Sequence, residues 1–524
     1  MFAACTLFLA ACGKQTVKIM TPPDASNRVQ FSAEQLQTTL DKAGYQVMMQ
    51  QGDTTFSDPE IKTILLTEVN DTTLKKEGFH ITTTGNLTKV SGKDGSGVIY
   101  GCRELIDRVN DSDGKLNFPE DLKDAPEMVL RGACVGLQKM TYLPGHGVYE
   151  YPYTPESFPW FYDKEQWIKY LDMLVANRMN SLYLWNGHPF ASLVKLEDYP
   201  FALEVDEETF KKNEEMFSFL TEEADKRGIF VIQMFYNIIL SKPFAEHYGL
   251  KTQDRNRPIT PLIADYTRKS IAAFIEKYPN VGLLVCLGEA MCTVEDDVEW
   301  FTETIIPGVK DGLQALGRTD EPPLLLRAHD TDCKLVMDAA LPIYKNLYTM
   351  HKYNGESLTT YEPRGPWSKI HTDLSSLGSI HISNVHILAN LEPFRWGSPD
   401  FVQKAVQAMH NVHGANALHL YPQASYWDWP YTADKLPNNE REFQLDRDWI
   451  WYQTWGRYAW NCHRDRTDEM GYWDHQLGKF YGTSDENASN IRVAYEESGE
   501  IAPKLLRRFG ITEGNRQTLL LGMF

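Results

Sequence analysis

The sequence predicts an α/β protein with a small N-terminal α/β domain, a (β/α)8 TIM barrel and a helical C-terminal segment. Two observations predict the barrel: apolar strand candidates alternate with amphipathic helices over about 300 residues, and eight such units follow one another. The composition agrees with this fold class, since 42% hydrophobic and 23% charged residues among 524 suit a large globular core. A doubly wound open sheet is the alternative, which the eight similar units and the lack of a Gly-rich phosphate loop disfavour.

The first twelve residues are predicted to be a lipoprotein signal peptide. The run is apolar and ends in Leu9-Ala10-Ala11-Cys12, which resembles a bacterial lipobox with Cys12 as the lipidated residue. A plain secretory signal is the alternative, and the run is too short to span a bilayer. We therefore expect export to the periplasm or outer membrane of a Gram-negative bacterium, with membrane contact only through the lipid anchor.

The N-terminal α/β domain is predicted over residues 17–122. Its expected elements are strands at 17–20, 45–49 and 64–67, a hairpin of 77–82 and 87–92, and helices at 32–43 and from 97 onward. The stretch from Glu77 to Val109 is similar to the small α/β domain that precedes the barrel in β-hexosaminidases and α-glucuronidases. That resemblance covers roughly residues 17–120 and implies a supporting role without chemistry.

The barrel is predicted over residues 125–435 and the helical C-terminal region over 440–524. The expected barrel strands are 128–136, 181–186, 229–236, 281–287, 323–328, 346–351, 384–389 and 417–421. The expected helices are 164–177, 208–227, 262–277, 298–316 and 401–413, then 443–460, 469–481 and 485–509 in the C-terminal region. Apolar residues recur there at helical spacing, as in Trp167, Tyr170, Leu171 and Leu174. The sequence ends inside an apolar stretch, which leaves room for a further C-terminal domain.

Acidic side chains follow two of the predicted barrel strands. A barrel keeps its chemistry at the carboxyl ends of its strands, and hydrolysis of a glycosidic bond needs two carboxyl groups. Glu289 and Glu392 are the predicted pair, expected to face each other across one cavity, and Asp330 and Glu356 are further catalytic candidates. The alternative is that these carboxylates form ion pairs at the barrel rim, as Glu392 would with Arg395.

Cationic, aromatic and amide side chains near the strand ends are predicted to bind a sugar. A uronic acid needs a cation for its carboxylate, and aromatic rings provide platforms for sugar faces. The predicted substrate-binding residues are Arg131, Trp185, Asn186, Asn237, Arg327, His329, His351, Lys352, Tyr353, His386, Trp396, His419, Tyr421 and Trp427. Aromatic strings at 151–153, 158–162 and 426–431 are expected to line the sugar path, or alternatively to form a hydrophobic lid.

Four segments of the predicted barrel resemble the corresponding segments of the bacterial and fungal α-glucuronidases. They are Tyr278–Glu289, Leu325–His329, Lys352–Glu356 followed by Glu362-Pro363, and Asn390–Glu392. The resemblance covers roughly residues 17–430 and implies that Glu289 is the general acid. In that family, acidic residues on the sixth and seventh strands act on the water. The sixth-strand segment here is one residue shorter and lacks the matching Asp, so Glu356 is the nearest acidic residue.

The sequence therefore predicts an exported glycoside hydrolase acting on a uronic-acid-containing plant or microbial glycan. One alternative is a polysaccharide lyase that cleaves beside a uronic acid by β-elimination, with barrel-mouth His and Tyr residues as base and acid. The other is a lipoprotein that binds glycans without catalysis. The expected partner is an anionic oligo- or polysaccharide, and the net charge of −19 argues against nucleic acid.

No metal or other cofactor is expected. The sequence contains no H-E-x-x-H pattern and no nucleotide loop, and a divalent ion held by His329, Asp330, His351 and His386 is the less favoured alternative. The cysteines beyond the signal segment form no C-x-x-C pair and are predicted to be free thiols.

Overall fold

The computed structural model describes most of the chain. The described residues are 14–137, 152–236, 239–289, 291–356, 358, 360–385, 397–423, 429–435, 437–438, 440–501 and 504. The chain forms two compact units, Met1–Pro126 with Lys226–Gly228 and Glu127–Asp225 with Ile229–Phe524.

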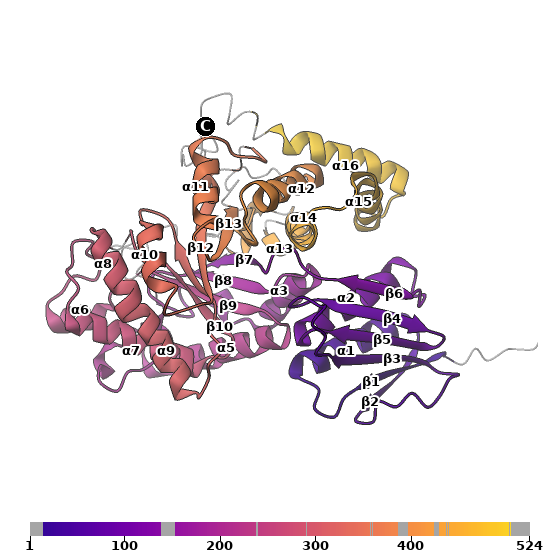
Figure 1. Cartoon of the computed structure of the whole chain (residues 1–524), viewed down its shortest axis with the longest axis horizontal. Coiled ribbons are helices and arrows are strands. Elements are labelled where there is room, and N and C mark those ends of the chain that lie inside the picture. Colours follow the sequence, from indigo (N-terminus) through magenta and orange to yellow (C-terminus); the bar gives the residue numbers. More distant parts are fainter. Residues whose placement is uncertain are drawn as a thin grey trace, which may run out of the picture. The chain divides into compact units, whose positions relative to one another are not determined.

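The first unit is built on a six-stranded sheet with the order β2-β1-β3-β5-β4-β6 (Figure 1). Its strands are β1 (Thr16–Thr21), β2 (Gln46–Gln51), β3 (Lys62–Glu68), β4 (Phe79–Thr84), β5 (Leu87–Gly92) and β6 (Asp121–Asp124), and its helices are α1 (Asn27–Lys42) and α2 (Gly95–Asp111). The predicted strands and hairpin are confirmed. The edge strand β6 was missed because Asp-Leu-Lys-Asp carries a single apolar residue.

The second unit contains a closed barrel of eight parallel strands in the order β10-β11-β12-β13-β14-β7-β8-β9. These strands are β7 (Leu130–Gly136), β8 (Ser181–Trp185), β9 (Phe230–Phe235), β10 (Val281–Val285), β11 (Leu324–Arg327), β12 (Leu347–Glu356), β13 (Ile380–Val385) and β14 (Ala417–Leu420). The predicted fold class is therefore confirmed. β13 begins before the predicted segment 384–389, because Ile380 and Ile382 supply its inward-facing side chains.

Helices follow the barrel strands along the chain. They are α3 (Lys164–Ala176), α4 (Phe190–Leu193), α5 (Glu207–Lys226), α6 (Lys242–Tyr248), α7 (Pro261–Lys277), α8 (Val294–Glu299), α9 (Ile306–Ala315), α10 (Cys333–Ala340), α11 (Pro366–Ser375) and α12 (Pro399–Gln407). Short turns are η1 (Pro159–Tyr162), η2 (Pro200–Ala202) and the π-helical η3 (Trp300–Ile305) and η4 (Ala408–Val412). α10 and α11 were not predicted, since their short runs give little helical periodicity.

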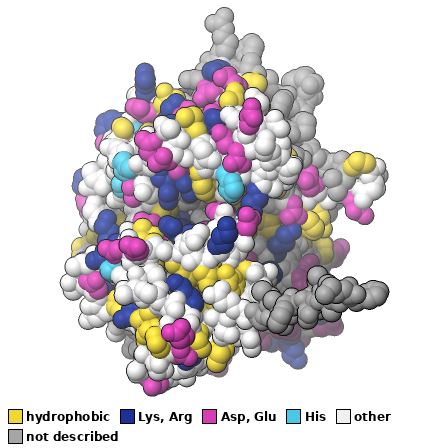
Figure 2. All heavy atoms as spheres, turned by 90° about the vertical axis from the view of Figure 1, so that its right-hand side faces the viewer, with side chains coloured by type: hydrophobic (Ala, Val, Ile, Leu, Met, Phe, Trp, Pro, Cys, Tyr) yellow, Lys and Arg dark blue, Asp and Glu magenta, His cyan; other side chains and the backbone are white. Residues whose placement is uncertain are grey.

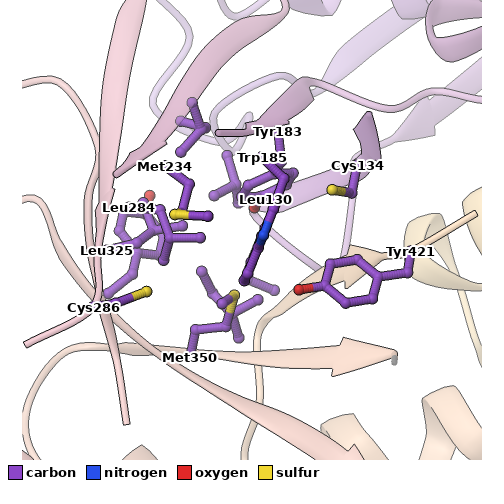
Figure 3. Packing of buried hydrophobic residues seen from close by; sticks show 14 of the residues in the cluster. Leu130, Cys134, Tyr183, Trp185, Met234, Leu284, Cys286, Leu325, Met350 and Tyr421 are labelled. Carbon is purple, nitrogen blue, oxygen red and sulfur yellow. The ribbon is translucent and has the colours of Figure 1, made fainter. Parts of the chain in front are cut away.

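Alternate residues of the strands fill the barrel interior (Figure 3). Tyr183 and Trp185 of β8 point inward with Met234 of β9 and Met350 of β12. Burying such large side chains stabilises a fold by about 25 cal/mol per Å² of apolar surface. The interior is thus a packed core, which leaves the strand ends as the place where a ligand could bind.

The C-terminal region packs on the barrel as the tryptophan-rich sequence predicts. It comprises β15 (Tyr431–Lys435), β16 (Arg441–Phe443), α13 (Gln444–Arg447), α14 (Trp449–Trp460), α15 (Arg466–Tyr481) and α16 (Asp485–Gly499). Trp451, Trp455 and Trp460 of α14 are fully buried. The antiparallel β15–β16 pair was not predicted.

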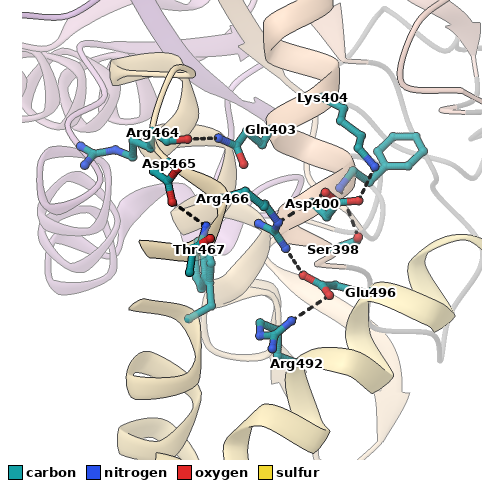
Figure 4. A network of polar contacts seen from close by, with 12 residues as sticks. Ser398, Asp400, Gln403, Lys404, Arg464, Asp465, Arg466, Thr467, Arg492 and Glu496 are labelled. Atoms are coloured by element: carbon teal, nitrogen blue, oxygen red, sulfur yellow. Dashed lines mark hydrogen bonds and ion pairs between the residues drawn. The ribbon is translucent and has the colours of Figure 1, made fainter. Parts of the chain in front are cut away.

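Ion pairs join α12 to the last two helices (Figure 4). Arg466 at the start of α15 lies 3.4 Å from Asp400 of α12 and also pairs with Glu496 of α16. Arg492 donates to Glu496 over 3.0 Å, so one carboxylate receives two guanidinium groups. Such a shared network is stronger than separate exposed pairs.

The surface carries charges of both signs. Figure 2 shows Lys and Arg side chains interspersed with Asp and Glu on the face drawn. Many surface pairs have helical spacing, such as Lys334 with Asp338 at 2.5 Å, and solvent weakens such exposed pairs. None of the helices in the described ranges is long and apolar enough to cross a membrane. The six cysteines beyond the signal segment are free, as predicted.

A chain of buried histidines lies between the outer faces of β12 and β13 and helix α11. His371 Nε2 donates to the Tyr353 carbonyl over 3.0 Å, so its Nδ1 must accept from His381 Nε2 over 2.8 Å. His381 Nδ1 in turn accepts from the Thr349 hydroxyl over 2.9 Å. This order of donors and acceptors needs both rings neutral. Burial lowers the pKa of His371 to about 3 and holds that of His381 well below its usual value.

We predict that these histidines make the folded chain less stable as the pH decreases below about 6.5. The unfolded chain takes up protons there and the folded chain does not, so each ring removes about 1.4 kcal/mol per pH unit until its folded pKa is reached. Urea denaturation at pH 8 and pH 5 measures the loss. His371→Gln should reduce the difference between the two pH values, whereas exposed His247→Gln should retain it. Equal differences for wild type and His371→Gln would contradict the assignment.

Candidate active site

Glu289 lies beyond the carboxyl end of β10 and contacts Arg327, the last residue of β11, and His329, which follows that strand. Arg327 Nη1 donates to Glu289 Oε1 over 3.0 Å, and His329 Nε2 lies 3.4 Å from the same oxygen. The Glu289 side chain is 20% exposed, so it is held from below and still reaches solvent. A carboxylate fixed at the mouth of a barrel in this way can act on a bound substrate.

Arg327 is the buried support of this carboxylate. Its Nη1 lies 3.4 Å from the Tyr236 hydroxyl and 3.7 Å from Cys286 Sγ, and the guanidinium lies 5.1 Å from the centre of the Trp185 ring. Burial acts to lower the pKa of Arg327, but Cys286, Tyr236 and Glu289 outweigh it and hold the pKa well above its usual value. Arg327 therefore carries a permanent positive charge beneath Glu289.

His329 connects Glu289 to a second carboxylate. Its Nε2 lies 3.7 Å from Asp330 Oδ2, and Arg255 Nη2 lies 3.9 Å from the same oxygen. Burial and the charge of Arg327 lower the pKa of His329, with Lys352 adding to the effect, so the ring is neutral at pH 7. A neutral imidazole between two carboxyl groups can donate or accept a proton.

Gly288 allows the loops after β10 and β11 to touch. A Cβ at this position would lie 1.9 Å from the Asp330 carbonyl oxygen, so a side chain there would force the loops apart. The Gly288 N–H donates to Thr331 Oγ1 over 3.1 Å, and Arg255 Nη2 donates to the Gly288 carbonyl over 2.9 Å. These contacts fix the backbone that carries Glu289.

Four residues of this arrangement were not among the predicted site residues: Tyr236, Arg255, Cys286 and Thr331. Arg255 lies in the long segment between β9 and α7, far along the chain from any strand end, so strand-end position did not signal it. Tyr236 and Cys286 directly follow β9 and β10, and inward alternation would have identified them.

The structure corrects the substrate-binding prediction for Arg131. Its side chain is fully buried near the amino end of β7, where Nη1 donates to the Met128 carbonyl over 2.6 Å and Nε to the Arg178 carbonyl over 2.7 Å. The guanidinium also lies 5.4 Å from the centre of the Trp460 ring. Arg131 thus lies at the amino end of the barrel, opposite to the carboxyl end, where a substrate would bind.

Tyr353 and His351 point to the outer face of β12 and are corrected in the same way. The Tyr353 hydroxyl donates to the Tyr361 carbonyl over 2.6 Å, and its ring is fully buried. The His351 ring centre lies 5.5 Å from that of Trp367 on α11. Strand alternation puts these odd-numbered residues on the face of β12 opposite to Tyr348 and Met350, which lie in the barrel core.

His419 and Asn186 are also structural in their contacts. His419 is fully buried inside the barrel, stacked on Tyr183 with ring centres 3.6 Å apart, below the mouth. Asn186 Nδ2 donates to the Leu137 carbonyl over 3.0 Å, and Asn186 Oδ1 accepts from the His188 N–H over 2.9 Å. Asn186 therefore shapes the turn after β8, and direct substrate binding by either residue is not supported.

The remaining aromatic candidates line the upper interior. The Tyr421 and Trp185 rings meet edge to face at 5.5 Å, and both are buried next to Arg327. In the first two aromatic strings, 151–153 and 158–162, the described side chains of Tyr153, Phe158 and Phe161 are buried, which agrees with the lid alternative. In the last string, Trp429 is 6% exposed and lines a surface pocket with Phe443.

Several predicted site residues lie outside the described residues. They are Cys12, Asn237, His386, Glu392, Trp396 and Trp427. Glu356 is the last residue of β12, and its side chain is not described. The expected convergence of Glu289 and Glu392 thus stays a prediction. Within the described part of the chain, His329, Asp330 and His351 do not form a three-ligand group.

Comparisons with known proteins agree with this architecture. Residues 12–120 match the family model for domain 2 of glycosyl hydrolase family 20. A solved enzyme of glycoside hydrolase family 138, described as targeting pectin rhamnogalacturonan II, is 75% identical, with a TM-score of 0.91 over 97% of this chain. The chain is similar to a glycoside hydrolase. It spans 58% of that enzyme's length.

More distant solved structures share the fold alone. The Streptomyces plicatus N-acetyl-β-hexosaminidase is 12% identical with a TM-score of 0.53, over 89% of this chain and 91% of its own. The Flavobacterium johnsoniae chitobiase is 13% identical with a TM-score of 0.55, over 94% of this chain and 71% of its own. The search of curated proteins gave no significant match. The resemblance to α-glucuronidases in particular stays a prediction.

We predict that Arg327→Ala lowers the free energy of unfolding by about 3 kcal/mol, because it removes the partner of a largely buried carboxylate. The Arg327 side chain is 7% exposed, whereas that of Arg255 is 50% exposed. Arg255→Ala is therefore the control and should change stability by about 0.5 kcal/mol or less. Urea denaturation at pH 7 measures both, and equal losses would refute the supporting role of Arg327.

Proposed function

We propose that this chain is the catalytic part of an exported glycoside hydrolase that cleaves a uronic-acid-containing plant glycan of the pectin type. The 75% identity over 97% of the chain to an enzyme described as targeting pectin rhamnogalacturonan II carries the proposal. The fold by itself would not, since barrels host many reactions. The contacts of Glu289 supply the chemical argument.

Glu289 is proposed as the catalytic carboxyl that acts on the glycosidic oxygen or the anomeric carbon. It sits at the carboxyl end of the barrel, within reach of His329, and it remains partly open to solvent. Arg327 holds Oε1 over 3.0 Å, so the carboxyl group keeps one orientation when substrate binds. Fixed orientation of a reacting group is a main source of enzymatic rate.

The second carboxyl group that hydrolysis needs has three candidates. Asp330 is 60% exposed, and its carboxylate lies 3.7 Å from the imidazole that touches Glu289. The other two candidates from the sequence are Glu392, predicted to follow the seventh barrel strand, and Glu356, the last residue of β12. Glycosidases place the two groups about 5–5.5 Å apart for retention and about 6.5–9.5 Å apart for inversion.

Positive charge around the site supports a uronic acid substrate. Arg255, Arg327 and Lys352 surround Glu289 and His329, and the charges of Arg327 and Lys352 are both felt at His329. A sugar carboxylate would gain from these charges, most from the half-exposed guanidinium of Arg255. In a protein of net charge −19, such a local group of cations favours an anionic ligand.

The neutral His329 ring supports a second candidate function, that of a uronate lyase. Its lowered pKa leaves a neutral imidazole at pH 7, which is a suitable base for removing the proton beside a carboxylate. Lysis and hydrolysis leave different products, because β-elimination creates an unsaturated uronate that absorbs ultraviolet light and hydrolysis creates a new reducing end without that absorbance.

We predict that Glu289→Gln reduces turnover of rhamnogalacturonan II oligosaccharides by about 100-fold or more while substrate binding remains, because the amide cannot transfer a proton. Reducing-end release and absorbance are followed together, with exposed Glu303→Gln as the control that keeps full activity. Full activity of Glu289→Gln would refute the assignment. Ultraviolet-absorbing products would replace hydrolysis by lysis, and binding without any product would indicate a glycan-binding lipoprotein.

We also propose that Cys12 carries a lipid anchor at the outer surface of a bacterial membrane. The support is the Leu9-Ala10-Ala11-Cys12 sequence, because a lipobox cysteine is modified after signal cleavage. Cys12→Ser should move the protein from the membrane fraction to the soluble fraction of a bacterial host and abolish labelling by a radioactive fatty acid. Retained labelling in Cys12→Ser would contradict the proposal, and Cys292→Ser is the control.

A further inference from the structure

Three different metal-ligating side chains meet far from the candidate active site, where the chain enters β7 and where it leaves α14. They are Glu127, Cys462 and His463, and one possible ligand atom of each lies within 4.8 Å of the others. The backbone brings them together, since the Glu127 N–H donates to the Trp460 carbonyl over 2.9 Å and the Met128 N–H to the Ala459 carbonyl over 3.2 Å. These bonds fix the segment before β7 against the last turn of α14.

The distances within the group suit a small divalent cation. Cys462 Sγ and His463 Nδ1 are 3.6 Å apart. Two ligands of one tetrahedral zinc ion, with bonds of about 2.3 Å to sulfur and about 2.0 Å to nitrogen, lie about 3.5 Å apart. Glu127 Oε1 and His463 Nδ1 are 2.6 Å apart and share a hydrogen bond. An ion between them would replace this bond and increase their distance by less than about 1 Å.

Neighbouring groups already orient each of the three side chains. The Cys462 N–H donates to Glu127 Oε2 over 2.7 Å, which leaves Oε1 aimed at the histidine. Gln403 and Gln407 of α12 hold the Cys462 carbonyl at 3.2 and 2.9 Å. Asn411 Nδ2 donates to His463 Nε2 over 3.2 Å; with a metal at Nδ1 the proton of the neutral ring would sit on Nε2, and the Asn411 amide would turn to accept it through Oδ1. Outer contacts of this kind are typical of metal sites.

The π-helical turn η4 supplies that outer contact. It spans Ala408–Val412 at the end of α12 and brings Asn411 and His410 toward His463. π-helical turns often occur at functional sites. His410 Nδ1 is buried and has no hydrogen-bond partner among the described residues, and its ring centre lies 6.0 Å from that of His463. His410 is therefore a candidate fourth ligand after a side-chain rotation.

We infer that Glu127, Cys462 and His463 form a binding site for a zinc-type divalent cation. Thiolate, imidazole and carboxylate are the donors that Zn²⁺ accepts, and three protein ligands leave one position for water or His410. Cys462 is buried and His463 is about half exposed, so the site has a protected ligand and an open side. The bound ion displaces the thiol proton of Cys462, so affinity rises with pH.

The ion would join segments 335 residues apart in the chain. Glu127 lies directly before the first barrel strand, and Cys462 and His463 directly after α14, whose tryptophans pack on the barrel. A link that closes so long a loop restricts the unfolded chain strongly. The expected consequence is higher stability of the barrel unit, with no part in substrate binding.

The test is metal titration of the untagged, EDTA-treated full chain. Zn²⁺ should bind once per chain and raise the melting temperature, and Co²⁺ should give a thiolate charge-transfer band. Cys462→Ser should abolish the band and the rise in melting temperature, whereas Cys292→Ser, which changes an exposed free cysteine, should retain both. Glycan cleavage by the metal-free protein at a temperature below its melting point should remain unchanged.

Two outcomes would overturn the inference: no thiolate band with Co²⁺ in the wild type, or the same band in Cys462→Ser. Should buried Cys462→Ser fail to fold, His463→Gln replaces it, because His463 is half exposed and its removal leaves the core intact. His463→Gln should weaken Zn²⁺ binding by at least tenfold, and unchanged affinity would refute the site. These results are independent of the proposed glycosidase activity.

Discussion

The contact between Arg327 and Glu289 is the interaction on which the candidate site depends. A buried guanidinium must be compensated, and the structure compensates Arg327 with the Glu289 carboxylate, the Tyr236 hydroxyl and the face of Trp185. These three partners come from β8, β9 and β10 or their ends, and Arg327 itself ends β11. The charge therefore ties the barrel core to the loop that carries the chemistry, and Glu289 is oriented by the same contacts that stabilise the fold.

The loop contact at Gly288 makes this arrangement sensitive to small changes. The loops after β10 and β11 approach so closely that a Cβ at position 288 would overlap the Asp330 carbonyl. Through that approach His329 and Asp330 come next to Glu289. The barrel strands place each group at the same end of the barrel. The lack of a side chain at Gly288 then allows the loops to come close enough for contact.

Buried imidazoles and a cysteine–histidine–glutamate group give the barrel unit two further polar clusters away from its mouth. The His371–His381 chain links the outer faces of β12 and β13 to α11 through neutral rings, so it depends on pH. The group at Glu127, Cys462 and His463 connects the entry of the barrel to the end of α14. Both clusters lie away from the carboxyl ends of the strands, where the candidate active site is.

The sequence by itself determined the order of elements, because apolar periodicity reports which residues must be buried. It predicted the eight barrel strands, with β13 displaced, and it placed Glu289, Arg327 and His329 at strand ends, where the structure shows them in contact. It could not decide which way a strand residue points when both faces of the strand are buried. Arg131, His351 and Tyr353 were assigned to the site for that reason, although their side chains face outward or lie at the opposite end. Contacts between distant segments, such as Arg255 with Gly288 or Glu127 with Cys462, have no local signal, so only the tertiary structure decided them.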